Sequence, residues 1–182
     1  MGLHTKSFSA ALRGALREDI DVIMVGDMRD LETMSLAIEA SSTGHLVFGT
    51  LHTSSAAKTV DRVIEVFPVT KQEQIRSTLS DGLRAVIAQN LFKRIDKKGR
   101  VAALEIMIAT PAVRNLIREG KTFQIPSMIQ TGKKFGMQSL DDAIMGLLNK
   151  KIISPEDAYS KSNDKGKFLP FIKNPPADFI DV

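Results

Sequence analysis

The sequence predicts an α/β fold built around a parallel sheet. Two short apolar runs, residues 22–25 (VIMV) and 46–51 (LVFGTL), lack polar alternation, which predicts strands buried on both faces. Between them, apolar residues of segment 30–44 recur at helical spacing, with Asp30 placed to cap the first turn and Gly44 to end the last. A strand–helix–strand unit favours a right-handed parallel connection, so both strands end at one edge of the sheet.

Further helical patterns flank this unit. Segment 7–19 is amphipathic and leads into the first strand, while segment 53–68 opens with hydroxyl caps and stops at Pro68. Another helical pattern runs from residue 71 to about residue 89. Residues 90–108 then predict a hairpin with its turn at DKKG, and we expect this hairpin to extend the same sheet.

Short capped helices follow from residue 110. Pro111 stands at the first position of one of them, Ser139 and Asp142 form a capping-box arrangement in the next, and Ser154 and Asp157 form another. We therefore expect a first domain over residues 1–109, a helical subdomain over 110–161 and a solvated tail over 162–182, with the tail phenylalanines docking locally.

Composition narrows the class of protein. The chain has 182 residues, 43% of them hydrophobic and 25% charged, as in an ordinary globular domain. It has no cysteine, which excludes disulfides, a thiolate nucleophile and sulfur ligands for zinc and favours the cytoplasm. No apolar run is long enough to span a bilayer, so we expect only peripheral membrane association. The net charge of +4 comes from basic residues interleaved with acids, and the chain has one Tyr and no Trp, which argues against nucleic acid as a partner.

Polar side chains follow both predicted strands at their shared edge, where ligands of open α/β sheets bind. Asp27 follows the first strand in the manner of a Walker B acid, which holds Mg²⁺, usually through water, beside nucleotide phosphates. His52 follows the second strand and can donate a hydrogen bond to a phosphate oxygen, helped by Thr53 and Ser54. A structural cap is the alternative for Asp27, and a structural histidine is the alternative for His52.

Four arginines are candidates to meet phosphate: Arg13, Arg17, Arg29 and Arg62. A solvated helix face is the alternative for each, and Arg29 ranks first because it lies two residues past Asp27.

Two other sites are excluded. His45 and His52 cannot share a zinc ion, because seven residues of strand place them roughly 23 Å apart. The segment REGKT at 118–122 ends like a P-loop but has Asn115 where the first glycine belongs, and it follows a helix; no G-x-x-x-x-G-K-[ST] occurs in the chain.

Two longer stretches carry a family resemblance. ALREDIDVIMVGDMRD together with GHLVFGTLHTSSAAKTVDRVIEVFP resembles the Walker B and histidine boxes of the type II/type IV secretion ATPases. TPAVRNLIREGK is similar to the motif that marks the twitching-motility, or pilus retraction, ATPases within that superfamily. The resemblance covers residues from about 3 to about 160. It implies the C-terminal part of a RecA-like P-loop NTPase core, a parallel sheet with an added hairpin, followed by a small helical subdomain.

The resemblance also implies roles and partners. By this resemblance, Asp27 is expected to be the Walker B acid that holds Mg²⁺ through water, Arg29 its neighbouring arginine, and His52 the residue that senses the terminal phosphate of ATP. The implied nucleotide-binding residues are Thr53, Arg13, Arg17 and Arg62. The implied retraction signature is Ala112, Val113, Arg114, Asn115, Leu116, Ile117, Arg118, Glu119 and Gly120. The implied assembly is a hexameric ring of identical chains that acts on an inner-membrane platform protein at the cytoplasmic face of the membrane.

Two departures from the family shape the functional hypotheses. The family usually has Glu where this chain has Asp27. The N-terminal domain, the Walker A loop and the catalytic acidic box of the family are missing from this sequence. The chain is therefore expected to be part of a motor ATPase that turns over ATP negligibly by itself. The alternatives are a catalytically incompetent module that docks on retraction-motor rings through its helical subdomain, and a basic nucleic-acid binder. Half a sheet is also expected to expose an edge strand and an apolar face.

Overall fold

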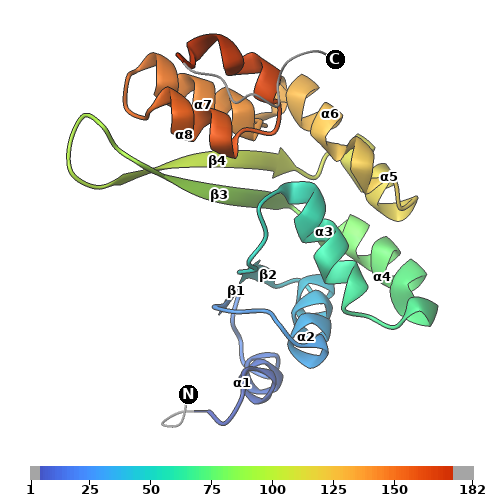
Figure 1. The fold of residues 1–182 in the computed structure, drawn as a ribbon. Coiled ribbons are helices and arrows are strands. Elements are labelled where there is room, and N and C mark those ends of the chain that lie inside the picture. Colours follow the sequence, from blue (N-terminus) through green and yellow to red (C-terminus); the bar gives the residue numbers. More distant parts are fainter. Residues whose placement is uncertain (1–4, 174–182) are drawn as a thin grey trace. The chain divides into compact units, whose positions relative to one another are not determined.

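The computed structural model describes residues 5–173, which divide into two compact units. Within these residues, unit 1 comprises 5–85 and 109–125, and unit 2 comprises 86–108 and 126–173. The elements of unit 1 are α1 (Phe8–Ala15), β1 (Val22–Val25), α2 (Leu31–Ser42), β2 (Leu46–Gly49), α3 (Ala56–Glu65), α4 (Val69–Gly82), α5 (Pro111–Arg118) and the short 3₁₀ helix η1 (Thr122–Gln124) (Figure 1).

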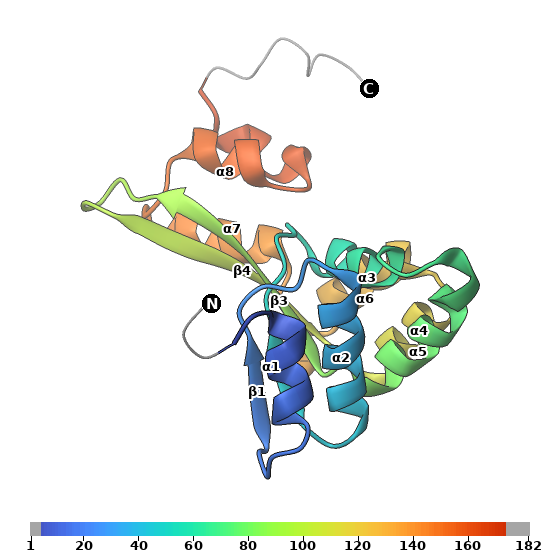
Figure 2. The ribbon, with the colours of Figure 1, turned by 90° about the horizontal axis from the view of Figure 1, so that it is seen from below.

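In unit 1, β1 and β2 pair in parallel, as the strand–helix–strand pattern predicts. The register runs from Val22 opposite Leu46 to Val25 opposite Gly49. One face of this sheet is covered by α1 and α2 (Figures 1 and 2), where Ile23 and Val25 are buried among apolar side chains of the two helices. The α/β class and the parallel connection are therefore confirmed.

The opposite face of the same sheet is open. Val22 and Met24 of β1 are 54% and 67% exposed, and Leu46 and Phe48 of β2 are 45% and 53% exposed. The prediction that both strands are buried on both faces is thus wrong, because helices of unit 1 cover only one side. The expectation of an exposed apolar face is confirmed.

Local capping sets the ends of α2. Asp30 has an extended backbone, and its carboxylate accepts hydrogen bonds from the Thr33 amide at 2.8 Å and the Thr33 hydroxyl at 2.7 Å. After the last turn, Gly44 adopts a φ of 104°, which a side chain with a Cβ disfavours. The predicted start and stop of this helix are confirmed, and they determine where the chain turns back toward β2.

Unit 2 is built on a hairpin. Its strands are β3 (Ala85–Lys93) and β4 (Arg100–Ile108). Its helices are α6 (Ile125–Thr131), η2 (Lys133–Phe135), α7 (Leu140–Asn149), α8 (Pro155–Lys161), η3 (Lys165–Lys167) and η4 (Leu169–Phe171). Ser139 and Ser154 cap α7 and α8 by accepting from the amides of Asp142 and Asp157, each at 3.1 Å. The helix predicted from 71 to about 89 ends at Gly82, and the residues from Ala85 onward belong to β3, in which buried and exposed side chains alternate.

The hairpin does not extend the β1–β2 sheet, which corrects the expectation from sequence. In the described part of the chain, β3 and β4 form a separate two-stranded sheet. Their inward side chains, Phe92 and Ala103, join a core with Ile144 and Leu148 of α7. A short antiparallel bridge between Ile106 and Gln138 further ties β4 to the chain before α7. The hairpin is therefore stabilised by the helices of its own unit.

The two units also divide the chain differently from the expected boundaries at 110 and 162. Residues 109–125 belong with unit 1, where α5 packs against α4, while the hairpin belongs with unit 2. The segment after α8 is not a free solvated tail. Phe168 is fully buried, and the amides of Asn163 and Asp164 donate to the buried carboxylate of Asp141 at 2.8 and 3.0 Å. The rest of the predicted tail, from 174 onward, lies outside the described residues.

The cap of α2 generates a first prediction. Replacing Asp30 by Ala should lower the free energy of unfolding by about 1 kcal/mol at neutral pH, because the Thr33 amide loses its acceptor. Hydrogen bonds from Thr33 hold the pKa of Asp30 below its ordinary value of 3.8. The carboxylate's contribution is therefore complete above pH 3.8 and is lost as the pH falls through the lower folded pKa.

Urea titrations between pH 7 and pH 2 measure both effects. The Asn variant keeps a good N-cap and should retain most of the stability at pH 7. Glu39→Ala, on the exposed side of the same helix, is the matched control and should change stability by less than about 0.5 kcal/mol. An Asp30→Ala variant as stable as the wild-type chain at pH 7 would contradict the capping role.

Candidate functional site

The carboxyl ends of β1 and β2 lie together and are tied by backbone and hydroxyl hydrogen bonds. The amide of Thr50 donates to the carbonyl of Val25 at 3.2 Å, and the amide of Met28 donates to the carbonyl of Thr50 at 3.0 Å. The hydroxyl of Thr50 donates to the carbonyl of Gly26. These bonds continue the strand pairing past the sheet and hold the two loops that carry the candidate residues.

Three of the predicted site residues meet at this shared edge. Arg29 Nε lies 2.6 Å from Asp27 Oδ2, and His52 Nε2 lies 3.7 Å from Asp27 Oδ1. A further contact of 3.4 Å joins Arg29 Nη2 to His52 Nε2. The Asp27 side chain is 27% exposed, whereas those of Arg29 and His52 are 72% and 74% exposed. A recessed carboxylate is thus flanked by a cation and an imidazole that reach solvent.

Only one of the two oxygens of the Asp27 carboxylate has a hydrogen-bond partner among the described residues. Oδ2 is held by Arg29, while the buried Oδ1 has no hydrogen-bond partner within the described residues. Among those residues, no group of three or more His, Asp or Glu side chains is arranged to hold a metal ion. A single carboxylate with a free oxygen fits Mg²⁺, which keeps several waters and takes its other ligands from substrate phosphates.

The other predicted nucleotide residues are not joined to this cluster by any hydrogen bond or ion pair in the described part of the chain. Arg13 forms an ion pair of 2.7 Å with Glu32, linking α1 to α2. Arg17 lies beside Arg13 in a shallow depression between the same two helices. The hydroxyl of Thr53 lies 2.7 Å from that of Thr59, and Arg62 is exposed on α3.

The predicted retraction signature forms α5 and its C-terminal turn, and one of its arginines has a structural role. Arg114 donates to the carbonyl of Ala109 at 2.8 Å and to those of Ser80 and Leu83, each at 3.1 Å; it also donates to the carbonyl of Asp81. Carbonyls at the end of α4 lack helical partners and carry partial negative charge, so a guanidinium satisfies them well. Arg114 therefore joins the signature to the end of α4.

The rest of the signature divides into a buried and an exposed side. Val113 and Ile117 have no exposed surface, while Ala112 and Asn115 are exposed and Leu116 is half-buried. Gly120 ends the helix with a φ of 70°, and the next amide, that of Lys121, donates back to Leu116 at 2.8 Å. Ile117 is consequently a core residue, and only the exposed side is available to a partner.

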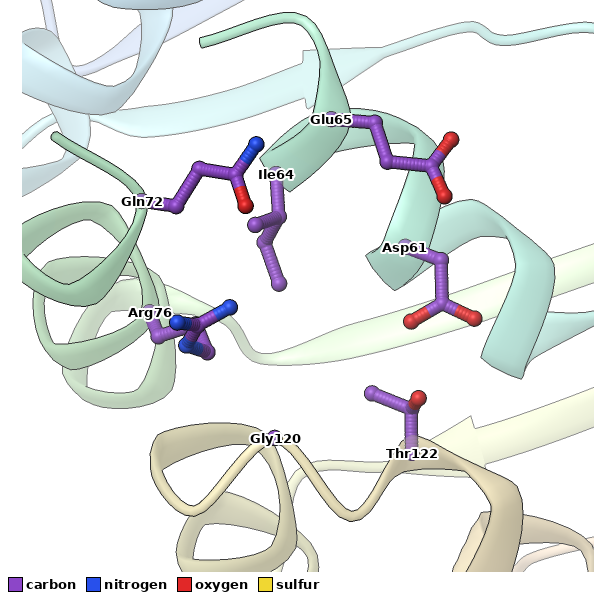
Figure 3. A pocket seen from close by; sticks show the side chains of 7 residues that line it. All are labelled: Asp61, Ile64, Glu65, Gln72, Arg76, Gly120 and Thr122. Carbon is purple, nitrogen blue, oxygen red and sulfur yellow. The ribbon is translucent and has the colours of Figure 1, made fainter. Parts of the chain in front are cut away.

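Sequence reasoning missed one feature beside the signature. A cavity of ≈ 160 Å³ lies between α3, α4 and the turn after α5, with two carboxylates on one wall and a guanidinium on another (Figure 3). The only signal in the sequence is a pair of acids four residues apart on α3. The cavity is lined by Asp61, Ile64, Glu65, Gln72, Arg76, Gly120 and Thr122.

A match over most of the chain shows which protein family it belongs to. Residues 3–134 match the family described as type II/IV secretion system protein. The chain belongs to this family. Within the described residues, no helix of this secretion-family chain is long and apolar enough to cross a membrane.

Two curated relatives of this secretion-family chain are similar over most of its length. The twitching motility protein of Neisseria gonorrhoeae is 57% identical over 161 residues, which are 88% of this chain and 43% of the relative. The type IV pilus retraction ATPase PilT of Pseudomonas aeruginosa is 60% identical over 158 residues, 87% of this chain and 46% of that protein. The chain thus spans less than half the length of these relatives.

Solved structures of the family show the same fold. A crystal structure of the pilus retraction motor PilT with bound ADP matches with a TM-score of 0.82 and 46% identity, over 91% of this chain and 46% of that one. The ATPase DotB of Legionella pneumophila matches with a TM-score of 0.75 and 31% identity, over 86% of this chain and 42% of that one. The resemblance to pilus retraction ATPases is therefore confirmed.

The signature helix generates a second prediction. Arg114→Ala should lower the free energy of unfolding by about 2 to 3 kcal/mol, because several partly buried carbonyls lose a charged donor. Arg118→Ala is the matched control on the same helix. Its ion pair with Asp81 at 2.9 Å is largely solvated, so its loss should cost less than about 1 kcal/mol. Urea unfolding measures both, and equal effects would contradict the capping role of Arg114.

Proposed function

We propose that the chain forms the Walker B and histidine-box half of the nucleotide site of a type IV pilus retraction ATPase. The observation that carries this proposal is the meeting of Asp27, Arg29 and His52 at the carboxyl ends of two parallel strands. Ligands of open α/β sheets bind at such edges. The relatives, a twitching motility protein and a type IV pilus retraction ATPase, supply the biological context.

The geometry supports a division of labour among these side chains. The ion pair with Arg29 holds Oδ2, which orients the carboxylate and leaves Oδ1 of Asp27 to accept a hydrogen bond from a water bound to Mg²⁺. Bound Mg²⁺ would neutralise charge on the phosphates of ATP. Exposed His52, within 3.7 Å of the same carboxylate, is placed to donate a hydrogen bond to the terminal phosphate.

Asp27 is shorter than the glutamate that the family usually has at this position. The carboxylate therefore lies further back by about one carbon–carbon bond, which fits a contact through water better than direct coordination. We also propose four further nucleotide contacts: Thr53, Arg13, Arg17 and Arg62. None of them joins the Asp27 cluster directly within the described chain, so other parts of the assembly would complete the site around them.

The assembled motor in this proposal is a hexameric ring of identical subunits. It works at the cytoplasmic face of the inner membrane, where a platform protein receives the mechanical output. The open apolar face of the β1–β2 sheet supports a larger assembly, because four exposed apolar side chains on one small sheet favour a covering layer. The exposed side of α5 supports a surface for contacts needed for retraction.

A third prediction tests the nucleotide half. The chain alone should show negligible Mg²⁺-dependent ATP turnover, because it has no P-loop to cradle phosphates. Adding the part of the N. gonorrhoeae relative that the chain does not cover should restore turnover. In that mixture, Asp27→Asn should reduce the rate by at least about 100-fold, and His52→Ala should reduce it by about 10- to 100-fold.

Phosphate release measures the rate, and Asp19→Asn, an exposed acid before β1, is the matched control. Turnover by the isolated chain, or full activity of the Asp27→Asn mixture, would overturn the proposed role of this edge. A failure of the two parts to associate would instead show in size-exclusion chromatography and would argue for the second candidate function.

That second candidate is a non-catalytic module that docks on retraction-motor rings through α5. The exposed side of the signature favours it, since Ala112 and Asn115 are free of the core.

As a fourth prediction, Ala112→Glu with Asn115→Arg should abolish capture of the P. aeruginosa retraction ATPase in a pull-down while the melting temperature stays within a few degrees. Ile117→Asp is unsuitable as a docking variant, because Ile117 is fully buried and a charge there unfolds the helix. Unchanged capture by the double variant would rule out docking through this side.

A further inference from the structure

The end of the β3–β4 hairpin carries several exposed basic residues. Lys97 and Lys98 lie in its loop, with Lys93 and Arg100 at the strand ends beside it. The amide of Ile95 donates to the carbonyl of Ile152 at 2.9 Å, which brings the turn between α7 and α8 against the loop. That turn adds two more lysines. We call the exposed residues Lys93, Lys97, Lys98, Arg100, Lys150 and Lys151 the hairpin-end cluster.

Charge is unevenly divided between the two units. Unit 1 has 12 acidic and 12 basic residues, whereas the described residues of unit 2 have 7 acidic and 13 basic ones, a formal excess of +6. None of the six side chains of the hairpin-end cluster forms a hydrogen bond or ion pair with another described residue. The loop acid, Asp96, is already bound by Arg94 through two hydrogen bonds of 2.9 and 2.5 Å. The cluster is therefore not neutralised internally and attracts an external polyanion.

An exposed apolar side chain lies in the same loop as Lys97 and Lys98. Ile95 is 58% exposed at the start of the loop, although its backbone is fixed by the bond to Ile152. An exposed apolar residue in a loop that carries lysines suits a membrane surface, where the cations meet anionic headgroups and the apolar tip enters the acyl boundary. Nucleic acid fits less well, because the cluster includes no aromatic side chain on which a base stacks.

We propose that the hairpin-end cluster, together with exposed Ile95, is a binding surface for anionic phospholipid membranes. The proposal goes beyond the nucleotide site and does not depend on it, since every residue involved belongs to unit 2. The surface would hold unit 2 against the bilayer by charge and a shallow apolar contact. The rigid attachment of the loop to the α7–α8 turn reduces the conformational entropy that binding would otherwise cost.

The test is co-sedimentation of the full chain with vesicles. Vesicles of equal parts phosphatidylcholine and phosphatidylglycerol should bind it at about 0.1 M salt and release most of it at about 1 M, where charges are screened within about 3 Å. Vesicles of phosphatidylcholine alone should bind little. Strong binding to them would instead report the exposed apolar face of the β1–β2 sheet and would overturn the proposal.

Paired variants separate this surface from net charge. Lys97→Gln with Lys98→Gln should weaken partitioning by on the order of 20-fold, at roughly fivefold per cation. Lys58→Gln with Lys71→Gln removes the same charge from exposed sites in unit 1 and should change partitioning less than about twofold. Equal effects of the two pairs would show that overall charge, not this surface, causes binding. Circular dichroism of each variant verifies the fold.

Two further measurements distinguish lipid from other polyanions. Ile95→Ser should weaken binding to anionic vesicles severalfold while leaving its salt dependence unchanged, because only the apolar contact is lost. No effect of this substitution would overturn the assignment to lipid. A DNA duplex added as a competitor should not displace the chain from vesicles; displacement at equal phosphate concentration would show a nucleic-acid surface and overturn the proposal as well.

Discussion

The parallel pairing of β1 with β2 is the constraint on which the site depends. Because the two strands run the same way and end opposite each other, the loops that follow them emerge side by side. A shift of one residue would turn Ile23 and Val25 out of the core and expose them, so burial under α1 and α2 enforces the register. Asp27 and His52, 25 positions apart in the chain, meet because of this register, and the hydrogen bonds of Thr50 hold their loops together beyond the last strand pair.

The position of α5 is explained by backbone groups of α4 that need hydrogen-bond partners. The end of α4 presents carbonyls that no helical amide reaches, and Arg114 supplies one guanidinium for several of them. Val113 and Ile117 bury the inner side of the helix, and Gly120 lets the chain turn sharply at its end. The side chains on the outer side of α5 do not contribute to the core. We therefore propose the partner surface for this side only, and not for the signature as a whole.

The two units differ in chemistry as well as in fold. Unit 1 is electrically balanced, holds the acid–arginine–histidine cluster and leaves an apolar sheet face open. Unit 2 carries the positive excess and concentrates it at the end of its hairpin, beside an exposed isoleucine. We therefore propose nucleotide chemistry for unit 1 and membrane attachment for unit 2.

By itself, the sequence determined the elements whose signals are local. Helix caps such as Asp30 and Ser139, the parallel connection and the edge shared by Asp27 and His52 all follow from spacing within a few tens of residues, and the long motifs identified the family. Only the tertiary structure decided what depends on distant partners. It showed that the hairpin packs with α7 instead of extending the first sheet, that Phe168 enters the core of unit 2 and that Arg114 caps α4. Such contacts depend on which surfaces remain uncovered after the local elements form, and no short pattern in a chain records that.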